Sequence, residues 1–265
     1  MKKTSFILIT ITIIVSVIFG CCYFRWKHLW GMERPLPMYK VEINNDDTIR
    51  VLVLGDSWAA MHNSMDSFLC SKIHEKISQP VVVASQGKGG EKSRGIYRLL
   101  FDNDSLGMRK LIRSGADYCV VFAGINDAAA NLGTKQYCYH YMLILDFLLD
   151  IGIRPVVVEI PDVDIWHLYS GKKIKDFIAD FSRSVMTGCK MYDMSSYRES
   201  LYETLKENYY LDSVLYISST LWNNKDMTIN PVLFLPDRIH LNKEGYKKLD
   251  ERIADAIKED ILFAH

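Results

Sequence analysis

Residues 50–58, Arg-Val-Leu-Val-Leu-Gly-Asp-Ser-Trp, join an apolar run to a Gly-Asp-Ser turn, and this join indicates the fold. An unbroken run of Val and Leu is typical of a strand that is covered on both faces, as in a parallel sheet. Similar runs recur at 81–84, 118–122, 155–160 and, more weakly, 190–194. The sequence therefore predicts a parallel sheet whose first strand is 50–54.

Longer amphipathic stretches lie between these runs and are expected to be helices. The helix candidates span residues 58–77, 93–114, 135–150, 172–187 and 243–260. In the last of them, Tyr246, Leu249, Ile253 and Ile257 recur at helical spacing. Alternating strands and helices predict an α/β fold with helices on both sides of the sheet. Active sites in such folds lie at the carboxyl ends of the strands, so reactive residues should directly follow the runs.

Ser57 follows the first run, at the expected turn from strand to helix. In that position its hydroxyl is exposed and its backbone N–H lies near a helix N-terminus, where partial positive charge stabilises an oxyanion. Taken alone, the segment also fits a simple helix cap formed by Asp56 or Ser57. Ser57 is therefore a candidate nucleophile whose assignment depends on its partners.

Two further polar segments follow the second and third runs. Residues 85–93 hold three glycines within four positions, which lets the backbone approach a ligand and direct N–H groups toward it. A phosphate-binding P-loop is the competing interpretation, but its Gly-Lys-Ser/Thr ending is missing. Asn126, in Gly124-Ile-Asn-Asp127, can offer its side-chain amide to an oxyanion, or it can form a simple turn with Asp127.

A fourth segment, Asp237-Arg-Ile-His240, precedes the last helix candidate. An Asp three residues before a His within a turn can bond the imidazole and fix its tautomer, so that the other ring nitrogen faces a serine. The order Ser57, Asp237, His240 is one of several chain orders that produce a catalytic triad. The plainer interpretation is a solvated carboxylate beside an incidental histidine.

Together, the four segments resemble the marker blocks of the SGNH (GDSL-like) hydrolase family, over roughly residues 48–260. The resemblance implies a three-layer α/β/α, flavodoxin-like fold with a five-stranded parallel sheet, and a serine esterase without a cofactor. It implies Ser57 as nucleophile, His240 as general base and later acid, and Asp237 as the residue that orients His240. It further implies an oxyanion hole made of the N–H groups of Ser57 and Gly90 and the side chain of Asn126.

The glycine segment departs from the family pattern at two positions. Ser85 stands where the family usually has Asn, and Lys92 stands where Thr or Ser often occurs. Gly90 is assigned to the oxyanion hole because it lies five positions after Ser85, the spacing of the family's oxyanion glycine.

Local features favour a carbohydrate ester as substrate, with acetyl or another short acyl group released. Trp58 follows the nucleophile and is suited to stack on a pyranose, while Lys92 and Arg94, beside the glycine segment, are suited to acidic sugar groups. Core packing for Trp58 and a solvated face for the basic residues are the alternatives. A polysaccharide O-acyltransferase using the same serine and an inactive glycan-binding module are the rival functions.

The N-terminal residues predict attachment to a membrane. Residues 4–24 contain no charge over 21 positions, and a helix of that length extends about 32 Å, enough to cross a bilayer core. The predicted organisation is a signal anchor at 1–24, a tether at 25–47 and a hydrolase domain at 48–265, outside the cytoplasm. Ile18-Phe-Gly-Cys21 faintly resembles a lipoprotein cleavage box, so a lipoprotein anchored at Cys21 is the alternative.

The remaining polar residues receive no catalytic assignment. Lys plus Arg and Asp plus Glu both total 32, so no global charge invites nucleic acid. The six cysteines lack metal-site spacing, and no metal is predicted. Asp162 and Asp164 are interpreted as loop carboxylates, with a metal or substrate contact as the alternative. The aromatic stretch 208–235 is expected to be a loop or partial helix over the site, and His62 carries no predicted role.

Overall fold

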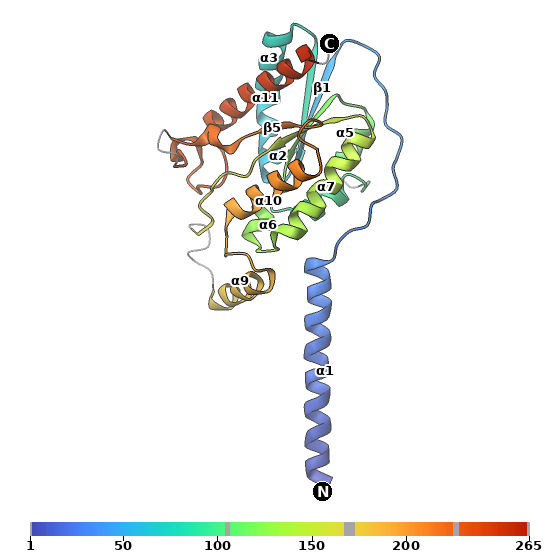
Figure 1. Cartoon of the computed structure of the whole chain (residues 1–265), viewed down its shortest axis with the longest axis vertical. Helices are drawn as coiled ribbons and strands as arrows, with labels where there is room; N and C mark the ends of the chain where they lie inside the picture. Colours follow the sequence, from blue (N-terminus) through green and yellow to red (C-terminus); the bar gives the residue numbers. More distant parts are fainter. Residues whose placement is uncertain (1, 104–106, 167–172, 225–227, 264–265) are drawn as a thin grey trace. The chain divides into compact units, whose positions relative to one another are not determined.

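The chain divides into two compact units, residues 1–33 and 34–265, in a computed structural model that describes residues 2–103, 107–166, 173–224 and 228–263 (Figure 1). The first unit contains helix α1 (Lys2–Trp30). Its window Phe6–Phe24 is exposed and apolar over 19 residues, long enough to cross a membrane. Length and composition of this window suit a membrane anchor and a signal sequence alike.

The second unit is built on one five-stranded parallel sheet in the order β2-β1-β3-β4-β5. The strands are β1 (Ile49–Gly55), β2 (Val81–Gly87), β3 (Tyr118–Phe122), β4 (Arg154–Val158) and β5 (Leu215–Ile217). All four neighbouring pairs are parallel, and every residue of β3 at the centre is buried. The predicted α/β fold with a five-stranded parallel sheet is confirmed.

The last strand is not where the sequence pattern placed it. Residues 190–194 form a turn that leads into helix α10 (Met194–Glu207), and Asp193 caps this helix by accepting the Ser196 N–H at 3.2 Å. The fifth strand lies instead within the aromatic stretch 208–235, where Leu215 pairs with Val156 of β4. At three residues, β5 is too short to give a recognisable apolar run.

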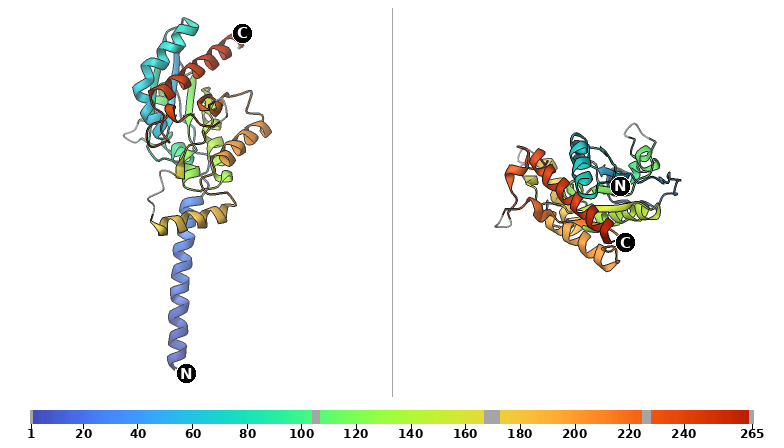
Figure 2. Two further views of the ribbon diagram at one scale, coloured as in Figure 1. Left: turned by 90° about the vertical axis from the view of Figure 1, so that its left-hand side faces the viewer. Right: turned by 90° about the horizontal axis from the view of Figure 1, so that it is seen from above.

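Helices cover both faces of the sheet (Figure 2). One group of helices contains α2 (Ser57–His62), α3 (Asp66–Ile77) and α11 (Lys243–Phe263). Helices α2 and α3 contact β2, and α11 contacts α3 and β5. The other elements are α4 (Ser93–Leu99), α5 (Met108–Arg113), α6 (Ile125–Ala129), α7 (Thr134–Asp150) and α9 (Ile174–Thr187), with short 3-10 turns at Asn63–Met65, Ser219–Trp222 and Pro231–Leu233. Each predicted helix stretch contains a helix. The pattern missed α10 and the short α6.

The segment before β1, residues 34–48, packs on the rest of the second unit. The Leu36 N–H donates to the Tyr97 hydroxyl at 2.8 Å, and the Tyr39 hydroxyl donates to the Leu100 carbonyl at 2.6 Å. The Tyr39 ring also contacts Phe101, with ring centroids 5.6 Å apart. The stretch 25–47, predicted to be a tether, therefore differs in its two halves: it is helical as far as Trp30, and from Leu36 it lies on the body.

Gly55 brings the end of β1 close to the end of β3. Its φ is +151°, and a Cβ at this position would lie 2.0 Å from the Phe122 carbonyl oxygen. The Asp56 N–H donates to that same oxygen at 3.1 Å. Only glycine permits this approach, and it sets Asp56 and Ser57 at the carboxyl edge of the sheet.

Candidate active site

Three side chains from distant parts of the chain meet at the carboxyl edge of the sheet. Ser57 is the first residue of α2, and Asp237 and His240 lie in the loop before α11. The Ser57 Oγ lies 2.9 Å from the His240 Nε2, and the His240 Nδ1 lies 2.7 Å from the Asp237 Oδ2. With Nδ1–H donating to the carboxylate, Nε2 is left to accept the serine proton, which is the arrangement of an activated nucleophile.

Asp237 is held in place by its own loop. Its Oδ1 accepts the backbone N–H groups of Ile239 at 2.9 Å and His240 at 3.0 Å. Burial raises the pKa of Asp237, but the hydrogen bonds from the ring and backbone of His240 and from Ile239 outweigh it, so the pKa lies below its usual value. The carboxyl group is therefore ionised at neutral pH and suited to stabilise a protonated imidazole.

Asp56 fixes the start of α2, the helix that begins at Ser57. Its buried carboxylate accepts the Trp58 N–H at 2.9 Å and the Asn126 side-chain amide at 3.1 Å. Burial raises the pKa of Asp56 to about 7 despite these hydrogen bonds. The backbone N–H of Ser57, the residue before Trp58, has no acceptor among the residues that the structure describes. An N–H in the first turn of a helix has no partner within that helix, so it is available to a substrate oxygen.

Asn126 connects the turn before Ser57 to the glycine segment. Its Nδ2 donates to Asp56 and also to the Glu91 carbonyl at 3.0 Å. Glu91 adjoins Gly90, which has φ +72° and whose N–H donates to no described group. Asn126 thus bonds the sequence neighbours of Ser57 and Gly90, the two residues whose backbone N–H groups are predicted to bind an oxyanion. Both of its own amide hydrogens already have acceptors, which the sequence pattern did not foresee.

Asp127 and Ser93 support the glycine segment from behind. The buried Asp127 carboxylate accepts the Ser93 N–H at 2.9 Å and the Ser93 hydroxyl at 2.6 Å. Burial raises the pKa of Asp127 to about 6, although the Ser93 hydrogen bonds oppose that rise. This contact joins the start of α6 to the start of α4, so the loop that carries Gly90 is fixed at its far end.

The residues predicted to bind substrate lie in different environments. Trp58 is 2 % exposed and packs on Trp222 and Phe234, with ring centroids 5.3 and 6.4 Å away. This position corrects the prediction that Trp58 stacks on a sugar, because no face of its ring is open. Lys92 and Arg94 are partly exposed beside the glycine segment, and the Lys92 Nζ lies 3.5 Å from the Gly90 carbonyl.

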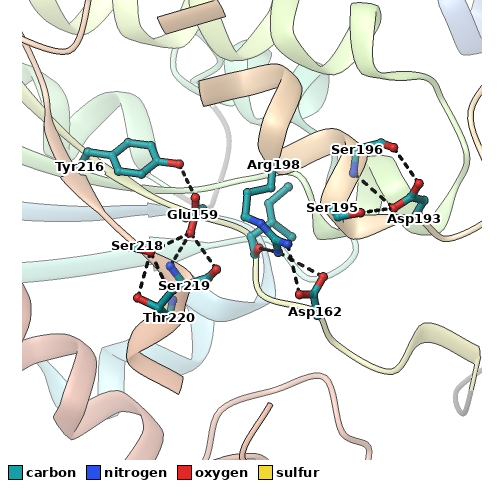
Figure 3. A network of polar contacts seen from close by, with 11 residues as sticks. Glu159, Asp162, Asp193, Ser195, Ser196, Arg198, Tyr216, Ser218, Ser219 and Thr220 are labelled. Carbon is teal, nitrogen blue, oxygen red and sulfur yellow. Dashed lines mark hydrogen bonds and ion pairs between the residues drawn. The ribbon is translucent and has the colours of Figure 1, made fainter. Parts of the chain in front are cut away.

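Hydrogen bonds also fix the loop after β4 (Figure 3). Glu159 accepts the Tyr216 hydroxyl at 2.7 Å and the Ser219 N–H at 2.6 Å, which holds the chain after β5 beside β4. Arg198 forms an ion pair with Asp162 at 3.1 Å and also donates to the Ile160 carbonyl. Burial raises the pKa of Glu159, but its four hydrogen bonds lower it overall.

Asp162 and Asp164 are paired with arginines. Arg198 binds Asp162, and Arg238 lies 3.2 Å from Asp164. Within the described residues, no group of three or more His, Cys, Asp or Glu side chains is placed to hold a metal ion. The positions of these two residues agree with their interpretation as loop carboxylates.

A buried ionic network that carries no predicted role begins at the end of α2. His62 is 0 % exposed; its Nε2 lies 2.8 Å from the Asp250 Oδ1, and its Nδ1 lies 2.8 Å from the Ser85 hydroxyl. Ser85 in turn donates to Asp66. The network joins the end of α2, the end of β2 and α11. A signal for it exists in the sequence, because Asp250 falls on the apolar face of the last helix, next to Leu249.

Replacing Asn126 tests the part it plays at the site. We expect Asn126→Ala to lower kcat/KM for ester hydrolysis about 100-fold, because a donor and the positioning of two backbone N–H groups are lost together. The loss of a partner for buried Asp56 should also lower the free energy of unfolding by about 1–3 kcal/mol. Steady-state kinetics and urea denaturation measure the two effects. Exposed Asn208→Ala is the control, and an Asn126→Ala variant with unchanged kcat would remove Asn126 from the chemistry.

The chain resembles solved esterases and lipases in structure. A GDSL-like lipase from Bacteroides thetaiotaomicron is 16% identical and superposes with a TM-score of 0.50, covering 80% of this chain and 88% of that chain. A psychrotrophic esterase from Pseudoalteromonas sp. is 16% identical, with a TM-score of 0.54 over 82% of this chain and 99% of that one. An acetylxylan esterase from Geobacillus stearothermophilus is 12% identical, with a TM-score of 0.54 over 79% and 94% of the two chains.

Sequence comparison adds nothing to these structural matches: no protein-family profile and no curated protein matches the chain. The structural similarity extends over 79–82% of this chain in the three matches. The second unit of this chain therefore has the fold of the SGNH (GDSL-like) hydrolases.

Proposed function

We propose that the chain is a serine esterase that removes an acetyl or other short acyl group from a carbohydrate ester. The observation that carries this proposal is the continuous line of hydrogen bonds from Ser57 through His240 to Asp237 at the carboxyl edge of the sheet. The fold supports it, because solved proteins with the same fold are esterases and lipases.

The proposed reaction has two stages. His240 takes the proton of Ser57 as the serine oxygen attacks the ester carbonyl, and the tetrahedral intermediate then expels the alcohol with a proton returned from His240. Water, deprotonated by His240, next attacks the acyl-serine, and the second tetrahedral intermediate releases the acid as His240 returns the proton to the Ser57 oxygen. Asp237 stays ionised throughout and stabilises the protonated imidazole in both stages.

The oxyanion of each intermediate is proposed to bind the N–H groups of Ser57 and Gly90. Neither group donates elsewhere among the described residues, and both lie beside a residue that Asn126 binds. Asn126 would join them by exchanging the Glu91 carbonyl for the substrate oxygen. One such donor contributes on the order of 3 kcal/mol to stabilisation of the transition state.

A carbohydrate substrate is favoured by the surroundings of the triad. A cleft of about 340 Å³, lined by Ile229, Pro231, Phe234, Arg238 and Asp164, includes residues of the loop that carries the triad residues Asp237 and His240. Its apolar wall and its ion pair suit a sugar ring with polar substituents. One protein with this fold is an acetylxylan esterase, which acts on such an ester. Lys92 and Arg94, partly exposed beside the glycine segment, are candidates to bind acidic sugar groups.

The cellular location is proposed from the N-terminal helix. We propose that α1 is a signal anchor that holds the esterase at the cell membrane, with the second unit outside the cytoplasm. The exposed apolar window Phe6–Phe24 supports this placement. A lipoprotein anchored at Cys21 is the alternative, and mass spectrometry of the membrane-extracted chain distinguishes an intact N-terminus from a lipidated Cys21.

Active-site labelling tests the function. The full-length chain in detergent is treated with a fluorophosphonate, and we expect one adduct, mapped to the peptide that contains Ser57. Hydrolysis of 4-nitrophenyl acetate should exceed that of the octanoate ester, and an added sugar acceptor should not increase acetyl release. A variant of a nearby exposed serine, Ser64→Ala, should label like the wild type.

Other outcomes favour the rival functions. An acyl-enzyme that discharges only when a sugar is added would indicate an O-acyltransferase. A folded chain that takes no adduct would contradict the esterase and favour a glycan-binding module.

A further inference from the structure

Helix α9 (Ile174–Thr187) presents its apolar face to the surroundings rather than to the core. Its large apolar residues fall at spacings of three, four and seven, which places them on one face of the helix. All are exposed: Ile174 by 79 %, Phe177 by 46 %, Ile178 by 57 %, Phe181 by 56 % and Val185 by 66 %. A helix on a soluble surface normally has the opposite arrangement.

The polar face of α9 holds it to the rest of the second unit. Asp180 is 1 % exposed and forms an ion pair with Arg183 and a hydrogen bond from the Tyr192 hydroxyl. The Tyr192 N–H donates to the Asn131 side chain at 3.0 Å, which links this contact to the end of α6. The helix is therefore seated by its polar residues, and rolling it over to bury the apolar face would unpair a buried carboxylate.

The exposed surface of α9 also has a one-sided charge. Lys175 is exposed, whereas the helix's carboxylates Asp176 and Asp180 are half-buried and buried, and exposed Lys173 lies just before the helix. Trp166, 55 % exposed, packs edge-on against Tyr192 at 4.8 Å, beside the helix's attachment. Apolar residues flanked by lysine and tryptophan are the composition of helices that lie in a membrane interface.

We propose that α9 is an interfacial helix, whose face of Ile174, Phe177, Ile178, Phe181 and Val185 inserts into the surface of a lipid bilayer. The inference rests on the membrane placement proposed above for α1. Nine residues, 25–33, separate the apolar window of α1 from residue 34, and nine residues span at most about 30 Å. A body held that close to a bilayer meets lipid at a high local concentration.

A bilayer fits this face better than a second copy of the chain does. The face belongs to a single helix that stands outside the α/β layers (Figures 1 and 2), and exposed lysines lie at the N-terminal end of that helix. Anionic headgroups instead complement the lysines, while the acyl region receives the apolar residues. Helix α9 also belongs to the segment between β4 and α10. This segment leaves the sheet at its carboxyl edge, the edge at which the catalytic loops lie.

Photo-crosslinking tests the proposal on the full-length chain. A p-benzoylphenylalanine residue replaces Phe181 in α9 or, as the matched control, Tyr209, another exposed aromatic residue that is 85 % exposed. Each protein is reconstituted into vesicles of phosphatidylcholine and phosphatidylglycerol, floated on a density gradient and irradiated. We expect lipid adducts at position 181, detected by mass spectrometry, at a yield at least ten times that at position 209.

The other outcomes overturn the proposal in distinguishable ways. A chain that does not float with the vesicles would remove the α1 anchor and the α9 inference with it. A chain that floats but gives a crosslinked dimer at position 181 would show that a second copy covers the face. A chain that floats and gives equal or no lipid adducts at the two positions would show that α9 stands clear of the bilayer. Thermal unfolding equal to that of the wild type verifies that both labelled chains are folded.

Discussion

Ser57→Ala and His240→Ala are each expected to lower kcat for hydrolysis of 4-nitrophenyl acetate on the order of 10⁵-fold. The reason is that the Ser57 Oγ and the His240 Nε2, 2.9 Å apart, act as one unit: without the base the hydroxyl is not activated, and without the hydroxyl the base has no proton to take. The double variant should therefore lose no more activity than either single variant. Steady-state kinetics on the purified full-length chain measures all three.

Two controls make this result specific. Ser64→Ala changes an exposed serine of the 3-10 turn that follows the nucleophile helix and should keep wild-type kcat. His74→Ala changes an exposed histidine of α3, whose ring bonds the Gln79 carbonyl, and should do the same. If the fold-loss of kcat in the double variant equalled the product of the two single losses, the result would contradict a shared role. A Ser57→Ala variant with a tenth of wild-type kcat would exclude Ser57 as the nucleophile.

Asp250→Asn is expected to lower the free energy of unfolding at pH 6.5 by about 3–5 kcal/mol. Asp250 and His62 are both fully buried, and the change leaves an imidazolium without its nearest counter-charge. Urea denaturation followed by circular dichroism measures the loss. An exposed ion pair of the same helix, Lys247 with Glu244 at 2.8 Å, provides the matched control, because Lys247→Ala should cost less than about 1 kcal/mol.

The pH dependence distinguishes this charged pair from ordinary packing. Burial lowers the pKa of His62, but hydrogen bonds to Asp250 and Asp66 outweigh it and raise the pKa from 6.5 to about 9. A folded pKa above the unfolded one contributes stability that is complete below pH 6.5 and is lost as the pH rises through 9. The wild type should therefore lose about 3 kcal/mol between pH 6.5 and pH 9. Asp250→Asn should lose much less over that range, and equal pH profiles would exclude a charged His62.

The meeting of Ser57, Asp237 and His240 could be predicted because these residues stand next to strong local signals. Ser57 follows an apolar run directly, and Asp237 and His240 lie three positions apart in one turn. Parallel strands align their carboxyl ends, so residues that follow different strands are brought to one edge of the sheet whatever the loops do. The prediction therefore needed the order of the segments and not their packing.

Trp58 and Asn126 show where such local reasoning fails. Trp58 adjoins the nucleophile in sequence, but a helix begins at Ser57, so the next side chain turns away from the edge and into the core against Trp222. The sequence pattern predicts that the Asn126 amide binds an oxyanion, whereas in the structure this amide binds Asp56 and Glu91. Neighbours in sequence point in different directions within a helix, and their partners come from other segments.

By itself the sequence determined the strand–helix alternation, the parallel sheet, the apolar N-terminal window and the residues that meet at the carboxyl edge. These follow from local hydrophobic periodicity and from the order of the motifs along the chain. Only the tertiary structure decided the burial of Trp58, the pairing of His62 with Asp250 and the outward apolar face of α9. His62 and Asp250 are 188 positions apart, and whether a charge is paired or a helix face is covered depends on what packs against it in three dimensions.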